Sequence, residues 1–223
     1  MSTSEEAKSI LLQAYYQNRW FEEVQVRNAI QQWEASLTAS EIDQWVSNYH
    51  WPTELHNKHL GVIMAGNVPL VGFHDLLSVL VVGDKAQVKL SSKDKVLMSF
   101  IINKLCAIEP RFKEQIEIVE ILKGFDAVIA TGGNNTSRYF EHYFGKYPNI
   151  IRKNRNSVAV LTGKETREEL ELLGLDIFQY YGLGCRNVSK IYVPLDYEFA
   201  PLFEALEPFA KTMDQDKYKN NND

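Results

Sequence analysis

From residue 60 onward, short apolar segments alternate with segments of helical spacing, and this alternation most constrains the fold. HLGVIMAG is a continuous apolar run typical of a buried strand, and the helical segment after it carries Pro69, which suits the first turn of a helix. Strands that alternate with helices indicate an α/β domain with a mainly parallel sheet. Further strands are expected in AQVKLSS, EQIEIVE, FDAVIATGG, NIIRK and SVAVLTG, with helices in KVLMSFIINKLCAIEP and NTSRYFEHYFG.

The first 50 residues have a different pattern, with apolar residues spaced three and four apart. This spacing predicts three helices, in SILLQAYYQNRW, VRNAIQQWEASL and ASEIDQWVSNY. Thr38 and Glu41 have the spacing of a capping box, which marks the start of the third helix. The sequence therefore predicts N-terminal helices followed by an open parallel sheet.

Charge and apolar patterning exclude two kinds of partner. The chain has 24 Lys and Arg against 29 Asp and Glu, a net charge of -5, and no basic stripe that could neutralise the phosphates of a nucleic acid. No apolar run is long enough to span a membrane. We therefore expect neither nucleic-acid binding nor a membrane span.

The cysteines and histidines bear on compartment and metal content. The chain has two cysteines, Cys106 and Cys185, and lacks a charged-then-apolar leader, which favours a reducing cytoplasm. Cys106 lies on the apolar face of a predicted helix and is interpreted as a core residue. His56 and His59 share a helical face, but no third ligand accompanies them, so no metal is expected.

Ligands of open α/β sheets bind at the carboxyl ends of the strands, so the strand-to-helix turns are the candidate sites. In one of these turns, Asn67 follows an apolar strand, where its amide could donate to a developing oxyanion or simply cap the next helix. In the turn ATGGNNTS, Gly132 and Gly133 allow close approach of a ligand to a helix N-terminus, as in a pyrophosphate cradle. The fingerprint GxGxxG is absent, so a plain glycine turn is the alternative.

Cys185 lies in the segment YYGLGCRNVSKIYVP. A single cysteine is often a small buried hydrophobe, and this interpretation competes with that of a nucleophile. Gly182 and Gly184 remove bulk beside the sulfur, while Arg186 and Lys190 could favour the thiolate. These flanking residues indicate an exposed and activated cysteine.

Several of these segments follow one another in a characteristic order, AGNVPL, VKLSS, IATGG, SVAVLTGK and YYGLGCRNVSKIYVP. In this order they resemble the acyl-CoA reductases of the aldehyde dehydrogenase superfamily, and above all the LuxC-type fatty-acid reductase of bacterial luminescence systems. The resemblance covers residues 60 to 194. It implies a Rossmann-like open parallel sheet of the aldehyde dehydrogenase type, and an oxidoreductase that reduces an acyl-CoA or other acyl thioester to an aldehyde through a cysteine S-acyl intermediate.

The resemblance also assigns functions to single residues. It makes Cys185 the nucleophile, Asn67 the side-chain oxyanion donor and Lys89 the ligand of the adenosine ribose. Relatives that prefer NAD carry a glutamate three positions after this lysine, where this chain has Ser92, and the missing carboxylate favours NADPH through its 2'-phosphate. The cofactor-binding residues implied are Lys89, Ser91, Ser92, Thr131, Gly132 and Gly133.

One departure from hydrolysing aldehyde dehydrogenases is informative. Those enzymes carry a glutamate that activates water four residues before the lysine of their Glu-Leu-Gly-Gly-Lys motif, and this chain has Val160 at that position. Glu165 is close in sequence, but it lies beyond the glycine turn and is not expected to replace the base. Without a base the acyl-enzyme should resist water, as thioester chemistry requires.

The expected organisation has three parts. Residues 1–163 would hold the N-terminal helices and the nicotinamide cofactor-binding domain, residues 164–210 the start of a catalytic domain, and residues 211–223 a polar tail. Because family members continue further, an incomplete catalytic domain is expected. Two alternatives remain open, a non-catalytic nucleotide- or partner-binding fragment and a cysteine acyltransferase without a redox step. A homo-oligomer or an acyl-donating partner subunit is compatible with the expected organisation.

Overall fold

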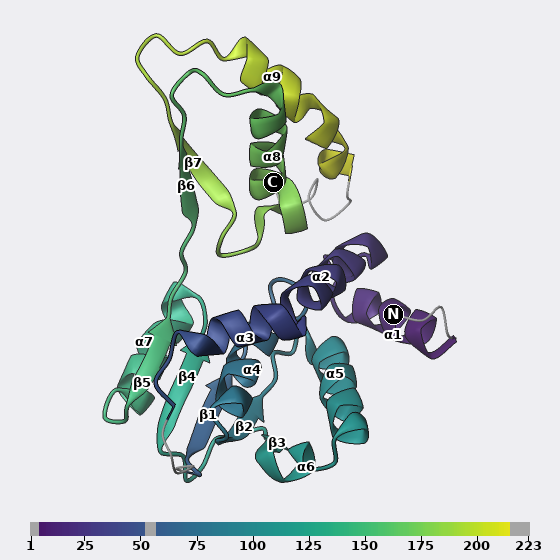
Figure 1. Ribbon diagram of the computed structural model, residues 1–223, viewed down its shortest axis with the longest axis vertical. Helices are drawn as coiled ribbons and strands as arrows, with labels where there is room; N and C mark the ends of the chain where they lie inside the picture. Colours follow the sequence, from purple (N-terminus) through teal and green to yellow (C-terminus); the bar gives the residue numbers. More distant parts are fainter. Residues whose placement is uncertain (1–4, 52–56, 215–223) are drawn as a thin grey trace. The chain divides into compact units, whose positions relative to one another are not determined.

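The computed structural model describes residues 5–51 and 57–214 (Figure 1). The chain divides into two compact units, Met1–Lys153 and Asn154–Asp223. From the sequence we expect the cofactor-binding part to extend to residue 163, whereas this division falls after Lys153. None of the helices in the described part of the chain combines the length and apolar character needed to cross a bilayer.

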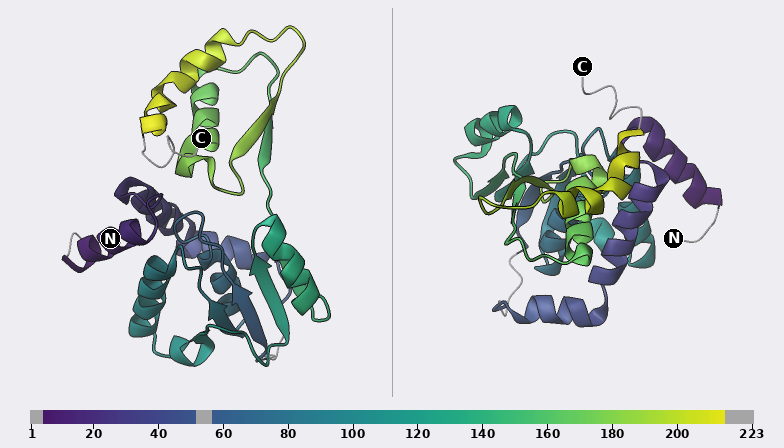
Figure 2. Two further views of the ribbon diagram at one scale, coloured as in Figure 1. Left: turned by 180° about the vertical axis from the view of Figure 1, so that it is seen from behind. Right: turned by 90° about the horizontal axis from the view of Figure 1, so that it is seen from above.

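The first unit is built on a five-stranded sheet in the order β3-β2-β1-β4-β5, in which every pair of neighbours is parallel. The predicted α/β class with a parallel sheet is therefore confirmed. β1 is central and lies beside β4, as the view from behind in Figure 2 shows. The strands are β1 (His59–Ile63), β2 (Lys85–Lys89), β3 (Ile116–Ile118), β4 (Ala127–Thr131) and β5 (Asn149–Arg152).

Seven helices belong to the described part of the first unit, and the three predicted at the N-terminus are among them. Thr38 Oγ1 accepts a hydrogen bond from the Glu41 N–H, so the predicted start of the third helix is confirmed. The helices are α1 (Glu5–Gln17), α2 (Glu23–Ser36), α3 (Ala39–Ser47), α4 (Phe73–Val81), α5 (Lys95–Ile108), α6 (Phe112–Gln115) and α7 (Asn134–Phe144).

The core of the first unit forms where α4 and α5 cover the central strands. Val62 of β1 and Val88 of β2 are fully buried and share one apolar cluster with Leu76, Leu97 and Met98 of the two helices. Burial of each such side chain stabilises the fold by about 1.5–3 kcal/mol. This packing accounts for the apolar run of β1, in which the adjacent residues Gly61 and Val62 are both buried, whereas burial alternates along β2.

α4 begins later than its sequence indicates. Pro69 lies in the turn before the helix, which starts only at Phe73. The reason is Leu70, whose φ of 58° lies in the left-handed region and interrupts any helix that would begin at the proline.

The second unit contains a two-stranded parallel sheet, a crossover helix and a C-terminal helical segment. The sequence predicts SVAVLTG as a strand of the cofactor-binding part, which would extend to residue 163, but this strand, β6, lies in the second unit and pairs with β7. Of the polar tail predicted for residues 211–223, residues up to 214 belong to a helical segment, and residues 215–223 lie outside the described part. The elements are β6 (Ser157–Val160), α8 (Arg167–Phe178), η1 (Gln179–Gly182), β7 (Val188–Tyr192), α9 (Ala200–Leu206) and η2 (Glu207–Asp214).

An ion pair joins the start of α4 to the end of β5. Arg152 Nη1 donates to Asp75 Oδ1, and Asp75 is buried while Arg152 retains partial exposure. Burial alone would raise the pKa of Asp75, but hydrogen bonds from His74 and Arg152 outweigh it and hold the pKa below its ordinary value. The carboxylate is therefore ionised and depends on its partners.

Removing this arginine is expected to cost stability. Arg152→Ala leaves the Asp75 carboxylate buried with one of its two partners gone, and should lower the free energy of unfolding by about 2 kcal/mol in urea titrations. The neighbouring Lys153 forms an ion pair with Glu141 in which both side chains are about half exposed, so Lys153→Ala should cost at most about 1 kcal/mol. Equal losses in the two variants would contradict this account.

Candidate active site

The carboxyl ends of β2, β1 and β4 carry most of the residues singled out in the sequence. Ile63 of β1 pairs in register with Lys89 of β2 and with Ala130 of β4, so the three strands end at the same edge of the sheet. The segments that follow hold Asn67, then Ser91 and Ser92, then the glycine turn after Thr131. The structure thus brings these three segments of the first unit to one edge.

The Asn67 turn lies tightly against the turn after β2. Gly66 is buried, and a Cβ at this position would come within 2.4 Å of Ser91 Oγ, so only glycine fits there. Asn67 itself is half-buried. Contact between the two turns fixes Asn67 relative to the residues after β2.

A buried carboxyl group, Asp94, ties these two turns together, although its sequence context does not predict it as a site residue. Asp94 Oδ2 accepts a hydrogen bond of 2.8 Å from the Leu70 N–H, and the residue is only 1% exposed. Its other oxygen, Oδ1, has no hydrogen-bond partner among the described residues. Burial raises the pKa of Asp94 to about 8 despite the hydrogen bond from Leu70. Asp94 is therefore largely protonated at neutral pH.

The predicted cofactor residues after β2 differ in exposure. Lys89, the last residue of the strand, and Ser92 are exposed, whereas Ser91 is half-buried and its Oγ accepts a hydrogen bond of 3.3 Å from the Lys93 N–H. Lys89 and Ser92 are therefore accessible to a ligand from solvent, while Ser91 shapes the turn.

The turn after β4 is closely packed and contains an unsatisfied hydroxyl group. The Gly132 N–H donates to the Arg152 carbonyl at 3.1 Å, and a Cβ on Gly132 would lie 2.9 Å from the Phe140 ring of α7. Gly133 is the N-cap residue of α7. Thr131 Oγ1 is buried and has no hydrogen-bond partner in the described part of the chain. Buried hydroxyl groups without a partner are rare, so this atom is an unusual feature of the turn.

Cys185 lies in the second unit, in the turn that leads into β7. It is a free, half-buried thiol, and its N–H has no hydrogen-bond partner among residues 5–51 and 57–214. Cys106 is also half-buried, but it packs against the apolar cluster of the first unit, as expected for a core residue. Cys185 thus combines a half-buried thiol with a backbone N–H that has no partner in the described ranges.

Glu165 is held in a way that makes it a poor base. Its carboxylate accepts hydrogen bonds from the Thr162 N–H, from Thr162 Oγ1 at 2.9 Å and from the Gly163 N–H at 3.0 Å. These bonds, that of the Thr162 N–H above all, lower its pKa. Val160 has no ionisable group and is exposed on β6. Neither position therefore supplies a group ready to accept a proton at neutral pH.

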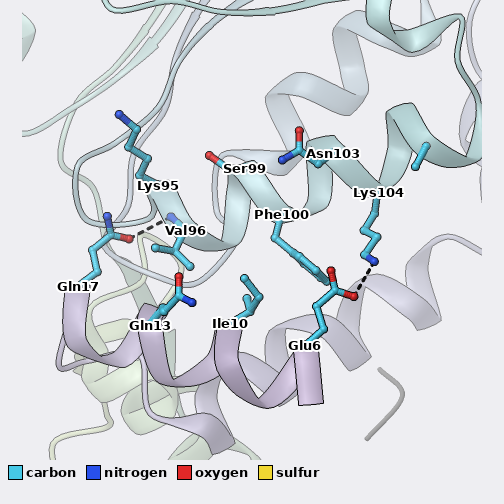
Figure 3. A pocket seen from close by; sticks show the side chains of 11 residues that line it. Glu6, Ile10, Gln13, Gln17, Lys95, Val96, Ser99, Phe100, Asn103 and Lys104 are labelled. Carbon is cyan, nitrogen blue, oxygen red and sulfur yellow. Dashed lines mark hydrogen bonds and ion pairs between the residues drawn. The ribbon is translucent and has the colours of Figure 1, made fainter. Parts of the chain in front are cut away.

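A groove of about 570 Å³ lies elsewhere in the first unit, between α1 and α5 (Figure 3). Side chains bridge it, because Gln17 accepts a hydrogen bond from the Val96 N–H and Lys104 pairs with Glu6. None of the residues predicted for catalysis or cofactor binding lines it. As for metals, no group of three or more His, Cys, Asp or Glu side chains in the described ranges could hold an ion.

Comparison with solved structures identifies the fold. The chain is similar to the substrate-bound AldH of Staphylococcus aureus (15% identity, TM-score 0.59), covering 96% of this chain and 52% of that one. It is also similar to aldehyde dehydrogenase 21 of Physcomitrella patens, determined with the reaction product succinate (17% identity, TM-score 0.55, 68% of this chain and 34% of that one). A third match is a propionaldehyde dehydrogenase variant from the fucose utilisation bacterial microcompartment of Clostridium phytofermentans (11% identity, TM-score 0.53, 67% of this chain and 37% of that one).

The chain thus spans about a third to a half of the length of these aldehyde dehydrogenases. A search of curated proteins finds no match. The family model described as acyl-CoA reductase (LuxC) matches residues 17–215, which is most of the chain. On this match, the chain belongs to the acyl-CoA reductase (LuxC) family and has a fold of the aldehyde dehydrogenase superfamily.

Proposed function

We propose that this chain belongs to an enzyme that reduces an acyl-CoA, or another acyl thioester, to an aldehyde with NADPH through an S-acyl intermediate on Cys185. The observation that carries the proposal is the gathering of the Asn67, Ser92 and Thr131 turns at one edge of the parallel sheet. Family membership supports the reaction class. We place the enzyme in the reducing cytoplasm, where free thiols persist.

The residues at this edge fit a nicotinamide cofactor. Lys89 would hold the adenosine ribose, and Ser92 would leave room for a 2'-phosphate without repelling it. The unsatisfied hydroxyl of Thr131 and the compact Gly132–Gly133 turn suit a phosphate or amide group close to the backbone. When bound, NADPH supplies the hydride that converts an acyl thioester into an aldehyde.

The protein's own part of the reaction starts at Cys185. Its thiolate attacks the carbonyl carbon, a C–S bond to the enzyme forms, and the carrier leaves as a thiolate. The free N–H of Cys185 donates to the carbonyl oxygen as negative charge develops there, and the family resemblance gives Asn67 the same task. After reduction, the C–S bond breaks and the aldehyde leaves.

Water should not compete with reduction, because neither residue 160 nor residue 165 supplies a base that could activate a water molecule. Val160 replaces the activating glutamate of hydrolysing relatives, and Glu165 is occupied by the Thr162 turn. The S-acyl enzyme should therefore last long enough to be reduced.

Intact-mass spectrometry after incubation with short-, medium- and long-chain acyl-CoA, with and without NADPH, tests the proposal. An acyl adduct on the Cys185 peptide that disappears with NADPH, with release of aldehyde, is the expected result. An adduct that persists with NADPH would instead identify a cysteine acyltransferase. No adduct with any acyl-CoA would identify a nucleotide- or partner-binding fragment.

Cofactor preference gives a separate prediction. Ser92→Glu places a carboxylate three residues after Lys89, where it would repel a 2'-phosphate, so the Kd of NADPH should rise about 10-fold relative to that of NADH. Titration of cofactor fluorescence measures both constants. Ser36→Glu, which adds the same charge at an exposed position of α2, is the control and should leave the ratio unchanged. An unchanged ratio in Ser92→Glu would remove Ser92 from the cofactor site.

A further inference from the structure

Asn187 closes the turn that carries Cys185. Its Oδ1 accepts a hydrogen bond of 2.7 Å from the Gly184 N–H, and its own N–H donates to the Gly184 carbonyl at 3.1 Å. A Cβ at Gly184 would come within 2.5 Å of Asn187 Oδ1, so glycine is needed for this contact. The two bonds join Gly184 to Asn187 and so close a turn in which Cys185 and Arg186 are the two central residues.

The same side chain fastens the turn to the end of α8. Asn187 Nδ2 donates to the carbonyl oxygens of Asp176 at 2.8 Å, Gln179 at 3.0 Å and Ile177 at 3.4 Å. Carbonyl groups in the last turn of a helix lack partners within the helix, so the amide satisfies groups that would otherwise depend on water. Because only an amide carries an acceptor and two donors together, neither Asp nor Ser can replace all of these bonds.

The path from α8 to Cys185 is strained, and Asn187 holds both of its ends. Three consecutive residues, Tyr180, Tyr181 and Gly182, have φ values of 52°, 58° and 69° in the left-handed region. A non-glycine residue in this conformation is energetically unfavourable and persists only where its surroundings fix it. Asn187 bonds to Gln179 before this stretch and to Gly184 after it.

We propose that Asn187 is the positioning residue for Cys185, because its carboxamide fixes the Gly184–Asn187 turn to α8 and so holds the sulfur and the free N–H of Cys185 in one fixed arrangement. The expected effect on acyl transfer rests on the proposed function of Cys185. The rigidity of the turn does not depend on that function. Misplacement of a reacting group by about 1 Å can cost about 100-fold in rate, so loss of the amide should act on acylation more than on general thiol reactivity.

The test compares Asn187→Ala and Asn187→Asp with Thr166→Ala. Thr166 caps the other end of α8 through a capping box with Glu169, so its loss weakens the same helix without removing a contact of the Cys185 turn. Three quantities are measured below the thermal transition of each variant. They are hydrogen exchange of the peptide spanning residues 183–187, alkylation of Cys185 by iodoacetamide, and S-acylation by acyl-CoA.

For Asn187→Ala we expect exchange in this peptide to rise at least about 10-fold, and the ratio of acylation to alkylation rates to fall about 10- to 100-fold. Asn187→Asp keeps the acceptor for Gly184 but loses the donors, and should fall between Asn187→Ala and the unmodified chain. Thr166→Ala should leave both quantities unchanged.

Two outcomes separate the inference from the proposed function. Faster exchange with an unchanged acylation-to-alkylation ratio, or a Thr166→Ala effect as large as that of Asn187→Ala, would overturn the positioning role. If the unmodified chain is alkylated but never acylated, the proposed function fails. In that case hydrogen exchange and alkylation test the positioning role of Asn187, which is refuted if Asn187→Ala changes neither rate.

Discussion

Replacing Cys185 by alanine is expected to abolish formation of the acyl adduct. The side chain supplies the only atom that bonds to the acyl carbon in the proposed reaction, so the acylation rate should fall by at least about 1,000-fold. Cys185→Ser keeps a weaker nucleophile and should acylate far more slowly than the thiol. Intact-mass spectrometry over time, with acyl-CoA in excess, measures the acylation rates of the unmodified chain and of both variants.

Cys106→Ala is the matched control for this experiment. Cys106 is the second free thiol and packs against the apolar cluster of the first unit, so its loss should lower stability modestly and leave the adduct intact. An adduct that forms in Cys185→Ala but not in Cys106→Ala would identify Cys106 as the nucleophile and refute the proposal.

The second large effect is expected in the pH dependence of stability, through Asp94. Its pKa rises from 3.8 to about 8 on folding because the group is buried. At every pH between these values the folded state keeps a proton that the unfolded state has released, so the free energy of unfolding falls as the pH rises from about 4 to about 8. This carboxyl's share of the fall is on the order of 5 kcal/mol.

Asp94→Asn should remove that dependence. An asparagine still accepts the hydrogen bond from the Leu70 N–H and cannot ionise, so the variant should match the unmodified chain near pH 4 and be the more stable of the two above pH 8. Urea unfolding at a series of pH values measures the difference. Asp84 also accepts a backbone hydrogen bond, from the Lys58 N–H, but it is not fully buried, so Asp84→Asn serves as the control. A constant difference between Asp94→Asn and the unmodified chain from pH 4 to 9 would show that Asp94 is ionised in the fold.

The sequence predicted those parts of the molecule that depend on contiguous residues. The apolar runs of β1, β2 and β4 lie in one stretch each, and the turns after them carry residues of unusual type, such as Asn67 and the Gly132–Gly133 pair. Because ligands of open α/β sheets bind at the carboxyl ends of the strands, the alternation of strands and helices also predicted these turns as candidate sites.

The remaining features depend on partners that are distant along the chain. The late start of α4 follows from the conformation of Leu70, whose N–H bonds to a carboxyl group 24 positions away. β6 has the pattern of any buried strand, and its sequence does not indicate that β7 is its partner. In its sequence context Asn187 is an ordinary polar residue, because its bonds to the carbonyl groups at the end of α8 join it to residues 8 and 11 positions earlier in the chain. The Asp94 signal was present as a potential N-cap before α5, but its side chain makes no cap bond and turns to Leu70 instead.

The central place of β1 in the sheet has a consequence for biosynthesis. One edge of β1 is covered by β2, which follows soon after it in the chain, whereas the other edge is covered by β4, which begins only at Ala127. At a translation rate of roughly 5–20 residues per second, several seconds pass before β4 leaves the ribosome. During that interval an apolar strand in the middle of the future sheet has a free edge, to which a strand of another nascent chain can add. We therefore expect co-translational chaperones to protect this segment, and its yield of folded protein to depend on how fast residues 64–126 are synthesised.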